Sequence, residues 1–221
     1  MTYPGGKSGA GVYQTIINHM PPHDIYIEPF LGAGAIINHK KPARINIGID
    51  IDPYVKRLWK DDVIENVHDA DILTHDGLKF LQTFRFKGNE LVYCDPPYLQ
   101  STRSKRNLYT YEFSDEQHLE LLGTIRVLPC MVMISGYYSD MYAENLSTWN
   151  HTTFEAMTRG GTKATEWLWY NFPKPDKLHD YSYVGDNYRE RERINKKVKR
   201  WIKTLTKCQQ KNVKQSLTPF V

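Results

Sequence analysis

The sequence has few cysteines, no long hydrophobic run and no signal-peptide pattern. Its three cysteines, Cys94, Cys130 and Cys208, are far apart and outside any Cys-x-x-Cys or Cys/His spacing suited to zinc, so neither a disulfide framework nor a metal site is predicted. No apolar stretch approaches the roughly 20 residues of a membrane span, and the first residues lack the charged and apolar regions of a signal peptide. We therefore expect a soluble cytoplasmic protein with no membrane partner.

The charge is distributed unevenly along the 221 residues, although the net charge is only +4. Residues 189–214 hold eleven Lys or Arg and two Glu, a net charge of +9, which leaves −5 for the rest of the chain. Such a tail suits a polyanionic partner, or it is simply a soluble basic helix. Its apolar residues fall at helical spacing and predict a helix that docks through one stripe: Ile194, Val198, Trp201, Ile202 and Leu205.

An apolar run from Leu91 to Cys94 leads into the motif Asp95-Pro96-Pro97-Tyr98. The run predicts an interior strand of a parallel sheet, and the prolines end its pairing because neither has a backbone N–H to donate. A carboxylate, the Pro96 carbonyl and the Tyr98 ring would then lie at the carboxyl end of a strand, where open α/β sheets bind ligands. The alternative is a strand-ending turn with an exposed aromatic ring.

These three groups suit an exocyclic amine of a nucleobase. The lone pair of such an amine is delocalised into the ring, so the nitrogen is a poor nucleophile. Two acceptors that hold its N–H bonds, the Asp95 carboxylate and the Pro96 carbonyl, would direct the lone pair toward an electrophile. The ring of Tyr98 could stack on the base and fix its plane.

Two glycine-containing loops precede this motif. Tyr3-Pro4-Gly5-Gly6-Lys7 could hold an anion through free N–H groups and the lysine, or it is an exposed turn. Leu31-Gly32-Ala33-Gly34-Ala35 follows a candidate strand, residues 25–30, and precedes a helix. Strand, glycine turn and helix are typical of a nucleotide site, although Ile37 replaces the third glycine of G-x-G-x-x-G.

Acidic residues are predicted at the ends of the next two strands. Residues 45–49 form a candidate strand ending at Asp50, at about the distance from the glycines that a ribose-binding acid requires. Asp52 precedes Pro53 and is better suited to open a helix. Residues 67–71 predict a third acidic strand end, with Asp71 placed to meet an adenine amino group. If parallel strands carry these residues, they face one crevice with Asp95; each Asp could instead be only a helix cap.

The later chain continues the alternation of strands and helices. Ser114-Asp115-Glu116-Gln117 is a capping box for a helix through Leu122. Residues 131–134 and 167–172 are candidate strands. The pattern supports an α/β sheet with helices on both faces.

Together these motifs resemble the Dam-type DNA adenine-N6 methyltransferases. The resemblance covers about residues 3–173 and is carried, in order, by Tyr3-Pro4-Gly5-Gly6-Lys7, Glu28-Pro29-Phe30-Leu31-Gly32-Ala33-Gly34, Asp50, Asp71, Asp95-Pro96-Pro97-Tyr98, Ser135-Gly136-Tyr137 and Glu166-Trp167-Leu168-Trp169-Tyr170-Asn171-Phe172. Asp-Pro-Pro-Tyr combined with Phe-x-Gly-x-Gly is specific, whereas each half alone is not.

The resemblance implies an α/β, Rossmann-like methyltransferase fold with a mostly parallel, seven-stranded sheet, and S-adenosylmethionine as the cofactor. It assigns the target base to Asp95, Pro96, Pro97 and Tyr98, with no metal and no covalent intermediate. It assigns the cofactor to Tyr3, Gly6, Lys7, Phe30, Gly32, Gly34, Asp50 and Asp71. A bacterial or phage-infected cell, with a restriction–modification or phage-type role, is the expected setting.

The sequence departs from that family in the length of one segment. A helical target-recognition domain usually precedes Asp-Pro-Pro-Tyr there, but only 23 residues, 72–94, separate Asp71 from Asp95. No large separate target-recognition domain fits, so DNA contacts are expected from residues 99–113, residues 153–164 and the basic tail, unless the first two are ordinary surface loops. The candidate DNA-binding residues are Arg103, Lys105, Arg106, Tyr109, Arg159 and Lys163.

The sequence thus predicts a catalytic domain over residues 1–173, followed by a linker and a basic helix over residues 174–221. The predicted function is methyl transfer from S-adenosylmethionine to N6 of adenine in double-stranded DNA, with base flipping, by a monomer or weak dimer. The alternatives are methylation of cytosine N4 or of RNA adenine. A non-catalytic nucleic-acid-binding protein would be expected to lack residues of the tetrad Asp95-Pro96-Pro97-Tyr98 or of the glycine loop, residues 31–35, and both motifs are intact.

Overall fold

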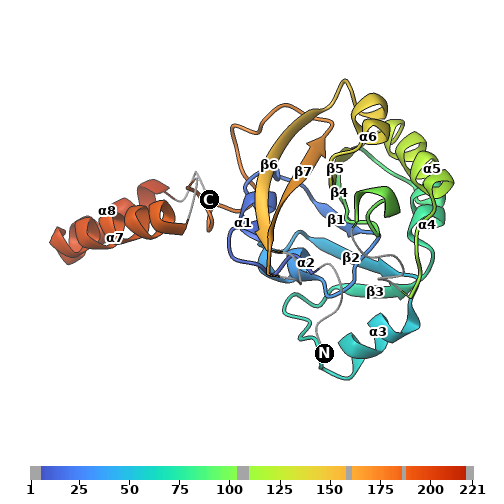
Figure 1. The fold of residues 1–221 in the computed structure, drawn as a ribbon. Coiled ribbons are helices and arrows are strands. Elements are labelled where there is room, and N and C mark those ends of the chain that lie inside the picture. Colours follow the sequence, from blue (N-terminus) through green and yellow to red (C-terminus); the bar gives the residue numbers. More distant parts are fainter. Residues whose placement is uncertain (1–5, 104–109, 158–160, 186–187, 218–221) are drawn as a thin grey trace. The chain divides into compact units, whose positions relative to one another are not determined.

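The computed structural model describes residues 6–103, 110–157, 161–185 and 188–217. The chain forms two units, Met1–Tyr181 and Ser182–Val221, and the first contains a seven-stranded sheet (Figure 1). The strands are β1 Ile25–Glu28, β2 Ile45–Asp50, β3 Asp71–Thr74, β4 Glu90–Cys94, β5 Met131–Gly136, β6 Asn150–Met157 and β7 Lys163–Tyr170. The helices of this unit are α1 Val12–Ile17, α2 Ala35–His39, α3 Pro53–Lys60, α4 Gly77–Thr83, η1 Gln100–Thr102, α5 Asp115–Arg126 and α6 Asp140–Asn145.

The strand order is β3-β2-β1-β4-β5-β7-β6. All neighbours are parallel except β7, which runs antiparallel to both β5 and β6. This mixed, mostly parallel order is typical of the Rossmann-like fold of S-adenosylmethionine-dependent methyltransferases, and the predicted fold class is confirmed. The order reverses between β1 and β4, and ligands bind at such a switch point, outside the carboxyl ends of the strands.

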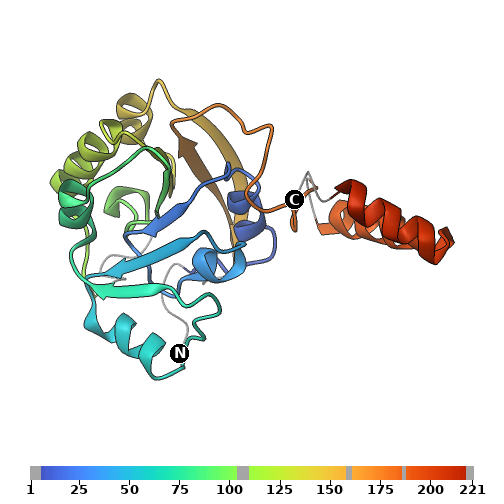
Figure 2. The same cartoon turned by 180° about the vertical axis from the view of Figure 1, so that it is seen from behind.

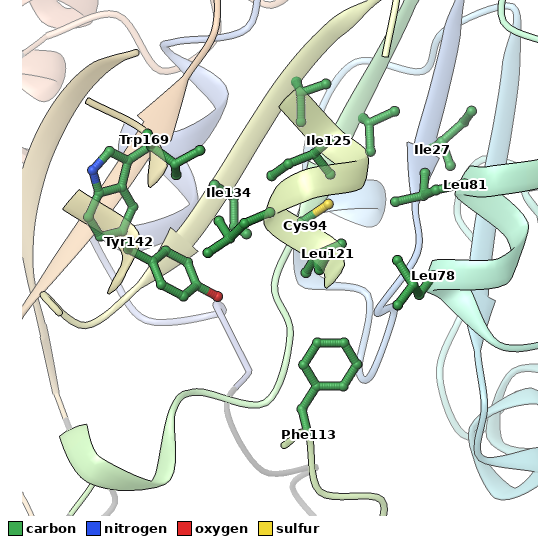
Figure 3. Packing of buried hydrophobic residues seen from close by; sticks show 14 of the residues in the cluster. Ile27, Leu78, Leu81, Cys94, Phe113, Leu121, Ile125, Ile134, Tyr142 and Trp169 are labelled. Atoms are coloured by element: carbon green, nitrogen blue, oxygen red, sulfur yellow. The ribbon is translucent and has the colours of Figure 1, made fainter. Parts of the chain in front are cut away.

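Helices cover both faces of the sheet. Figures 1 and 2 show α1 and α2 on one side and α4, α5 and α6 on the other. The apolar runs of β1 and β4 are buried along their whole length, as expected for strands covered on both faces. Alternate residues of β1, β4 and β5 pack against α4 and α5 (Figure 3): Ile27, Cys94 and Ile134 from the strands, with Leu78, Leu81, Leu121 and Ile125 from the helices.

Helix starts follow the predicted caps. Ser114 Oγ accepts the Gln117 N–H, and Gln117 Oε1 accepts the Ser114 N–H, so the capping box of α5 is confirmed. Asp52 accepts the Tyr54 N–H at the start of α3. The end of α5 was harder to predict: the helix continues to Arg126, four residues beyond Leu122, because Ile125 still packs in the core.

The strands of the β6–β7 hairpin are longer than β5, the strand with which β7 also pairs. β5 pairs with β7 from Met133↔Tyr170 to Gly136↔Trp167. The pairs between β6 and β7 continue beyond this point, from Phe154↔Glu166 to Met157↔Lys163. Since β5 ends at the carboxyl edge of the sheet, this part of the hairpin extends past that edge and reaches the loops that follow β4 and β5.

Two segments for which the sequence made predictions are the one between Asp71 and Asp95 and the one that follows residue 173. Between Asp71 and Asp95 lie only β3, α4 and β4, so the absence of a large separate domain there is confirmed. The first part of the segment predicted as a linker, residues 174–181, lies within the first unit and forms hydrogen bonds with other parts of it. His179 donates its backbone N–H to the Met20 carbonyl at 2.9 Å, and Asp180 accepts the Lys41 N–H at 2.8 Å.

The second unit contains two helices, α7 Tyr188–Thr204 and α8 Lys207–Leu217. The Gln210 side chain of α8 donates to the carbonyls of Ile202 and Leu205, which closes the turn between them. The predicted helix is therefore confirmed, and the docking of its apolar stripe stays a prediction. No helix among the described residues has the length and apolar composition that crossing a membrane requires.

Candidate active site

The loop after β1 turns tightly because of two glycines. Gly32 and Gly34 have φ of 50° and 61°, in the left-handed region that glycine adopts without strain. A Cβ on Gly34 would lie 2.2 Å from the Trp59 ring, so a side chain there would push α3 away from the loop. The predicted strand–glycine turn–helix unit is confirmed as local structure.

Asp50 lies at the end of β2 and holds this loop. One carboxylate oxygen accepts the Gly32 N–H at 2.8 Å and the other accepts the Asp52 N–H at 2.9 Å. Burial raises the pKa of Asp50, while these two hydrogen bonds act in the opposite direction. A carboxylate has about four acceptor positions, so Asp50 can still accept hydrogen bonds from a ligand.

Asp71 does not lie at a strand end that faces the site, and this prediction is wrong. It is the first residue of β3, paired with Ile47, whereas Thr74 at the other end of β3 lies level with Asp50. Asp71 therefore starts its strand at the edge of the sheet opposite to Gly32 and Asp50. The sequence pattern was misleading because β3 is an edge strand with a mostly exposed, weakly apolar sequence.

The acid that follows β3 is Asp76. Its carboxylate accepts the N–H groups of Leu78 and Lys79 and caps α4. Gly77 lies directly against the loop after β1, where a Cβ would be 2.0 Å from the Pro29 carbonyl oxygen. The dipeptide Asp-Gly ahead of the apolar start of α4 was the signal in the sequence that could have identified this position.

A cavity of about 400 Å³ lies between these loops, a size suited to a small-molecule ligand. It extends from the glycine loop to Asp95, and segment 110–113 forms another wall, with Phe30 and Phe113 edge to face at 5.5 Å. Lys7 is the one Lys or Arg among the described residues that line it, against five acids: Glu28, Asp50, Asp76, Asp95 and Glu112. The predicted cofactor residues in the lining are Gly6, Lys7, Phe30, Gly32, Gly34 and Asp50.

Glu28 is the most deeply buried acid of the cavity. It ends β1, is 3% exposed, and its Oε2 accepts the Tyr26 hydroxyl at 3.0 Å and the Ile37 N–H at 3.2 Å. Burial raises the pKa of Glu28 to about 8. Burial also lowers the pKa of Lys40, whose ammonium lies 4.3 Å from the centre of the Tyr26 ring, to about 7.

Asp95 follows β4, as predicted, and has two partners. Its Oδ1 accepts the Ser135 hydroxyl at 2.8 Å, and Lys7 Nζ lies 2.7 Å from Oδ1 and 2.8 Å from Oδ2. Ser135 is held in turn by the Tyr93 hydroxyl at 2.9 Å. Three segments far apart in the sequence, the N-terminal loop, β4 and β5, therefore fix the position of one carboxylate.

Tyr98 is buried, and its hydroxyl donates to Glu166 Oε2 at 2.7 Å. The Tyr137 ring meets it edge to face at 4.8 Å, and Lys7 Nζ lies 4.9 Å from its ring centre. Pro96 and Pro97 connect Asp95 to Tyr98, and Pro96 is buried. The four residues of the tetrad thus lie at the carboxyl edge of the sheet, as the sequence predicts.

Arg103 is not an exposed DNA-reading residue. Its side chain is 4% exposed and pairs with both carboxylate oxygens of Glu112, at 3.2 and 2.6 Å. This ion pair joins the two ends of segment 103–112, whose later part lines the cavity. Lys163 is exposed at the start of β7. The other predicted residues, Tyr3, Lys105, Arg106, Tyr109 and Arg159, lie outside the described residues.

Sequence reasoning gave no role to several residues that the fold brings to this site. Ser135 and Glu166 stood inside motifs that carried the resemblance, but their partners, Asp95 and Tyr98, are 40 and 68 positions away. Glu112 follows a stretch of cations and aromatics and has no distinguishing pattern of its own. No local pattern identifies such partners, because each pair is made by tertiary packing.

Several solved structures are similar to this chain. One is precorrin 8W decarboxylase of Methanobacterium thermoautotrophicum, at 12% identity over 76% of this chain and 93% of that one, with a TM-score of 0.49. Another is magnesium protoporphyrin IX methyltransferase of Synechocystis with bound SAM, at 11% identity over 73% and 76%, with a TM-score of 0.46. A third is Pyrococcus abyssi tRNA (uracil-54, C5)-methyltransferase with S-adenosyl-L-homocysteine, at 13% identity over 72% and 35%, with a TM-score of 0.48.

A comparison with curated proteins finds no match. A family model does match part of the chain, and it covers the segment from the approach to β3 through β6. Residues 65–158, which contain the whole of Asp95-Pro96-Pro97-Tyr98, match the D12 class N6 adenine-specific DNA methyltransferase family, and the predicted family resemblance is thereby confirmed.

Proposed function

We propose that the protein transfers a methyl group from S-adenosylmethionine to N6 of adenine in DNA, acting on a base flipped out of a duplex. The observation that carries the proposal is the continuity between the glycine-loop cavity and Asp95. The cavity's lining includes both the Gly32–Gly34 loop and Asp95, so a ligand held by the loop and an amine held by Asp95 would be neighbours. That arrangement suits direct transfer, for which proximity and orientation supply much of the rate.

The lining of the cavity suits this cofactor. S-adenosylmethionine supplies an electrophilic methyl group on a positively charged sulfonium. Glu28 holds its proton to about pH 8 and Glu112 is paired with Arg103, but Asp50, Asp76 and Asp95 still outnumber Lys7 in the lining, and this excess favours a cationic ligand. Gly32 and Gly34 would let the backbone approach the ligand closely, and the remaining acceptor positions of Asp50 would take the ribose hydroxyls. Asp76 and the Phe30 and Phe113 rings, which also line the cavity, would hold the remaining polar and flat parts of the ligand.

Asp95 would orient the target amine. Its Oδ1 already accepts two hydrogen bonds, from Lys7 and Ser135, whereas Oδ2 accepts one, from Lys7. Each carboxylate oxygen has about two acceptor positions, so Oδ2 can accept one N–H of the amine and the Pro96 carbonyl the other. Transfer would form the N–CH3 bond as the S–CH3 bond of the cofactor breaks, with S-adenosylhomocysteine as the leaving group, and the nitrogen would then lose one proton. The Asp95 side chain is 16% exposed, which allows that proton to pass along the Oδ2 hydrogen bond to water.

DNA contacts would come from the rim of this site and from the second unit. The β6–β7 hairpin extends past the edge of the sheet and carries exposed Lys163. Residues 189–214, with a net charge of +9, suit phosphate contacts that do not depend on sequence. Residues 99–113 and 153–164, which include Lys105, Arg106, Tyr109 and Arg159, would select the sequence.

The test is to express the protein in cells without adenine methylation and to sequence their DNA with a method that reports N6-methyladenine by position. We expect methylated adenines in one sequence context, and none with Asp95→Ala. Purified Asp95→Ala should have a turnover lower by orders of magnitude, because the Asp95 carboxylate orients the amine in the transition state, while cofactor binding, measured by calorimetry, survives. Methylated RNA or N4-methylcytosine with unmodified adenine in DNA would refute the proposed substrate.

A further inference from the structure

A second carboxylate stands close to Asp95. Glu166 lies on β7, where that strand extends past β5, and is 7% exposed. Its Oε2 accepts the Tyr98 hydroxyl at 2.7 Å and lies 3.6 Å from Lys7 Nζ. Glu166 therefore contacts the last residue of the tetrad and faces the cation that holds the first.

Lys7 binds the same carboxylate oxygens that a target amine would use. Its ammonium donates to both oxygens of Asp95 and lies 4.9 Å from the centre of the Tyr98 ring. An adenine amine that enters must share Asp95 with this ammonium or displace it. The Lys7 side chain is 6% exposed, and a buried ammonium without a carboxylate partner is costly, so Lys7 can leave Asp95 only if another acceptor is within reach.

We infer that Glu166 is a positioning residue for the transfer: it holds the Tyr98 ring by its hydroxyl and takes over Lys7 when a target amine occupies Asp95. Lys7 needs to approach Glu166 by only about 0.8 Å to reach charge-assisted hydrogen-bond distance. The ammonium then keeps a carboxylate partner throughout, and Asp95 is freed for the amine. No bond is made or broken in this step, and Lys7 keeps its proton. The inference rests on the proposed function for the identity of the amine.

The first experiment needs no substrate. Asp95→Asn removes the carboxylate that holds Lys7, so Lys7 should shift to Glu166, the other carboxylate that faces it among the described residues. Glu166→Gln should then lower Tm at least twice as much in the Asp95→Asn background as in the wild-type background. Gln retains the size of the side chain and an acceptor for the Tyr98 hydroxyl. Equal decreases in Tm would show that Lys7 does not use Glu166, and would overturn the inference.

The second experiment follows methyl transfer in single turnovers. Glu166→Gln should reduce the rate constant by about tenfold or more, since small misplacements at a reacting centre are costly, with cofactor affinity unchanged. Glu166→Asp, which keeps the charge on a shorter side chain, should recover part of the rate. The matched control is Glu120→Gln on α5, an exposed carboxylate that accepts the Gln82 side-chain amide at 2.8 Å and lies outside the regions assigned to DNA contact, which should behave as wild type.

Failure of this inference can be told apart from failure of the proposed function. If the wild-type protein methylates no adenine in DNA, the proposed function is wrong, and the Tm comparison still decides whether Lys7 can use Glu166. If the wild-type protein is active and Glu166→Gln transfers methyl groups as fast as Glu120→Gln, the inference is wrong and the proposed function stands. A decrease of cofactor affinity in Glu166→Gln would equally overturn a role confined to the target amine.

Discussion

Replacing Glu28 by Gln should change how the stability of the protein depends on pH. Glu28 is 3% exposed, and burial raises its pKa from 4.5 to about 8. The folded protein therefore keeps this proton to higher pH than the unfolded chain does. Protonated Glu28 therefore contributes fully to the stability of the folded protein below pH 4.5, and this contribution is lost as the pH rises through 8. A glutamine has no proton to lose, so the variant should escape that loss.

The size of the effect follows from the width of this pH window. Each pH unit inside it changes the free energy of unfolding by up to about 1.4 kcal/mol. Between pH 5.5 and pH 8 the wild-type protein should therefore lose about 3 kcal/mol of stability relative to Glu28→Gln, which corresponds to roughly 6 to 12 °C in Tm. His23, whose pKa is lowered by burial, is present in both proteins, whereas the charge of Glu28 raises the pKa of Lys40. The difference between the two proteins therefore reports Glu28 together with its coupling to Lys40.

The assay is urea or thermal unfolding of both proteins at several values between pH 5.5 and pH 8. Tyr26→Phe provides a second variant: the hydrogen bond from the Tyr26 hydroxyl lowers the Glu28 pKa, so its removal should raise that pKa further and steepen the loss above pH 7. A difference in unfolding free energy between wild type and Glu28→Gln that stays constant over this range would refute the reasoning, since it would mean that Glu28 is ionised in the folded protein.

Four further predictions concern the loops and the tail. Asp50→Ala should weaken cofactor binding before it affects turnover, and should cost about 1–3 kcal/mol of stability for each of the two N–H groups whose acceptor is removed; unchanged affinity in calorimetry would move the ribose contact elsewhere. Gly77→Ala should destabilise the protein by several kcal/mol, because its Cβ would lie 2.0 Å from the Pro29 carbonyl oxygen. Gly123→Ala in α5, where a Cβ meets nothing within 4 Å, should instead stabilise the protein by about 0.5–1 kcal/mol. Equal free energies of unfolding in urea for the two variants would contradict the close approach at Gly77. Arg103→Ala should lower stability by up to about 3 kcal/mol and leave the methylated sequence unchanged, because the side chain is buried in an ion pair; a changed methylation pattern would argue for base contact. Four basic residues of α7 can be replaced by Gln together: Lys196, Lys197, Lys199 and Arg200. This variant should bind all duplexes more weakly to a similar extent, and the slope of log affinity against log salt should fall by about 0.9 for each DNA phosphate that the helix no longer neutralises. A shifted recognition sequence would contradict this.

Local patterns in the sequence were sufficient where neighbouring residues set the structure. The glycines of the loop after β1 require a left-handed backbone that other residues adopt with strain, so Gly32 and Gly34 indicate the turn by themselves. Asp50 was located by its distance from those glycines, and Asp95 by an apolar strand that two prolines end. In each case the signal lies within a few residues or in the regular spacing of a strand–helix–strand unit.

The tertiary structure decided everything that depends on distant partners. Asp71 and Asp76 both stand beside short apolar runs, and only the pairing of Thr74 with Asp50 shows which of them reaches the site. Arg103 was expected at DNA, but its pairing with Glu112 buries it.

Lys7 and Asp95 are 88 positions apart, and Tyr98 and Glu166 are 68 apart. Hydrophobic periodicity fixes which face of an element is buried, but it does not state which polar side chains meet across the folded core. The sequence by itself therefore determined the glycine loop, the tetrad and the strands β1, β2 and β4 that lead into the site. Packing of the strands and the N-terminal loop determined the ionic network around Asp95.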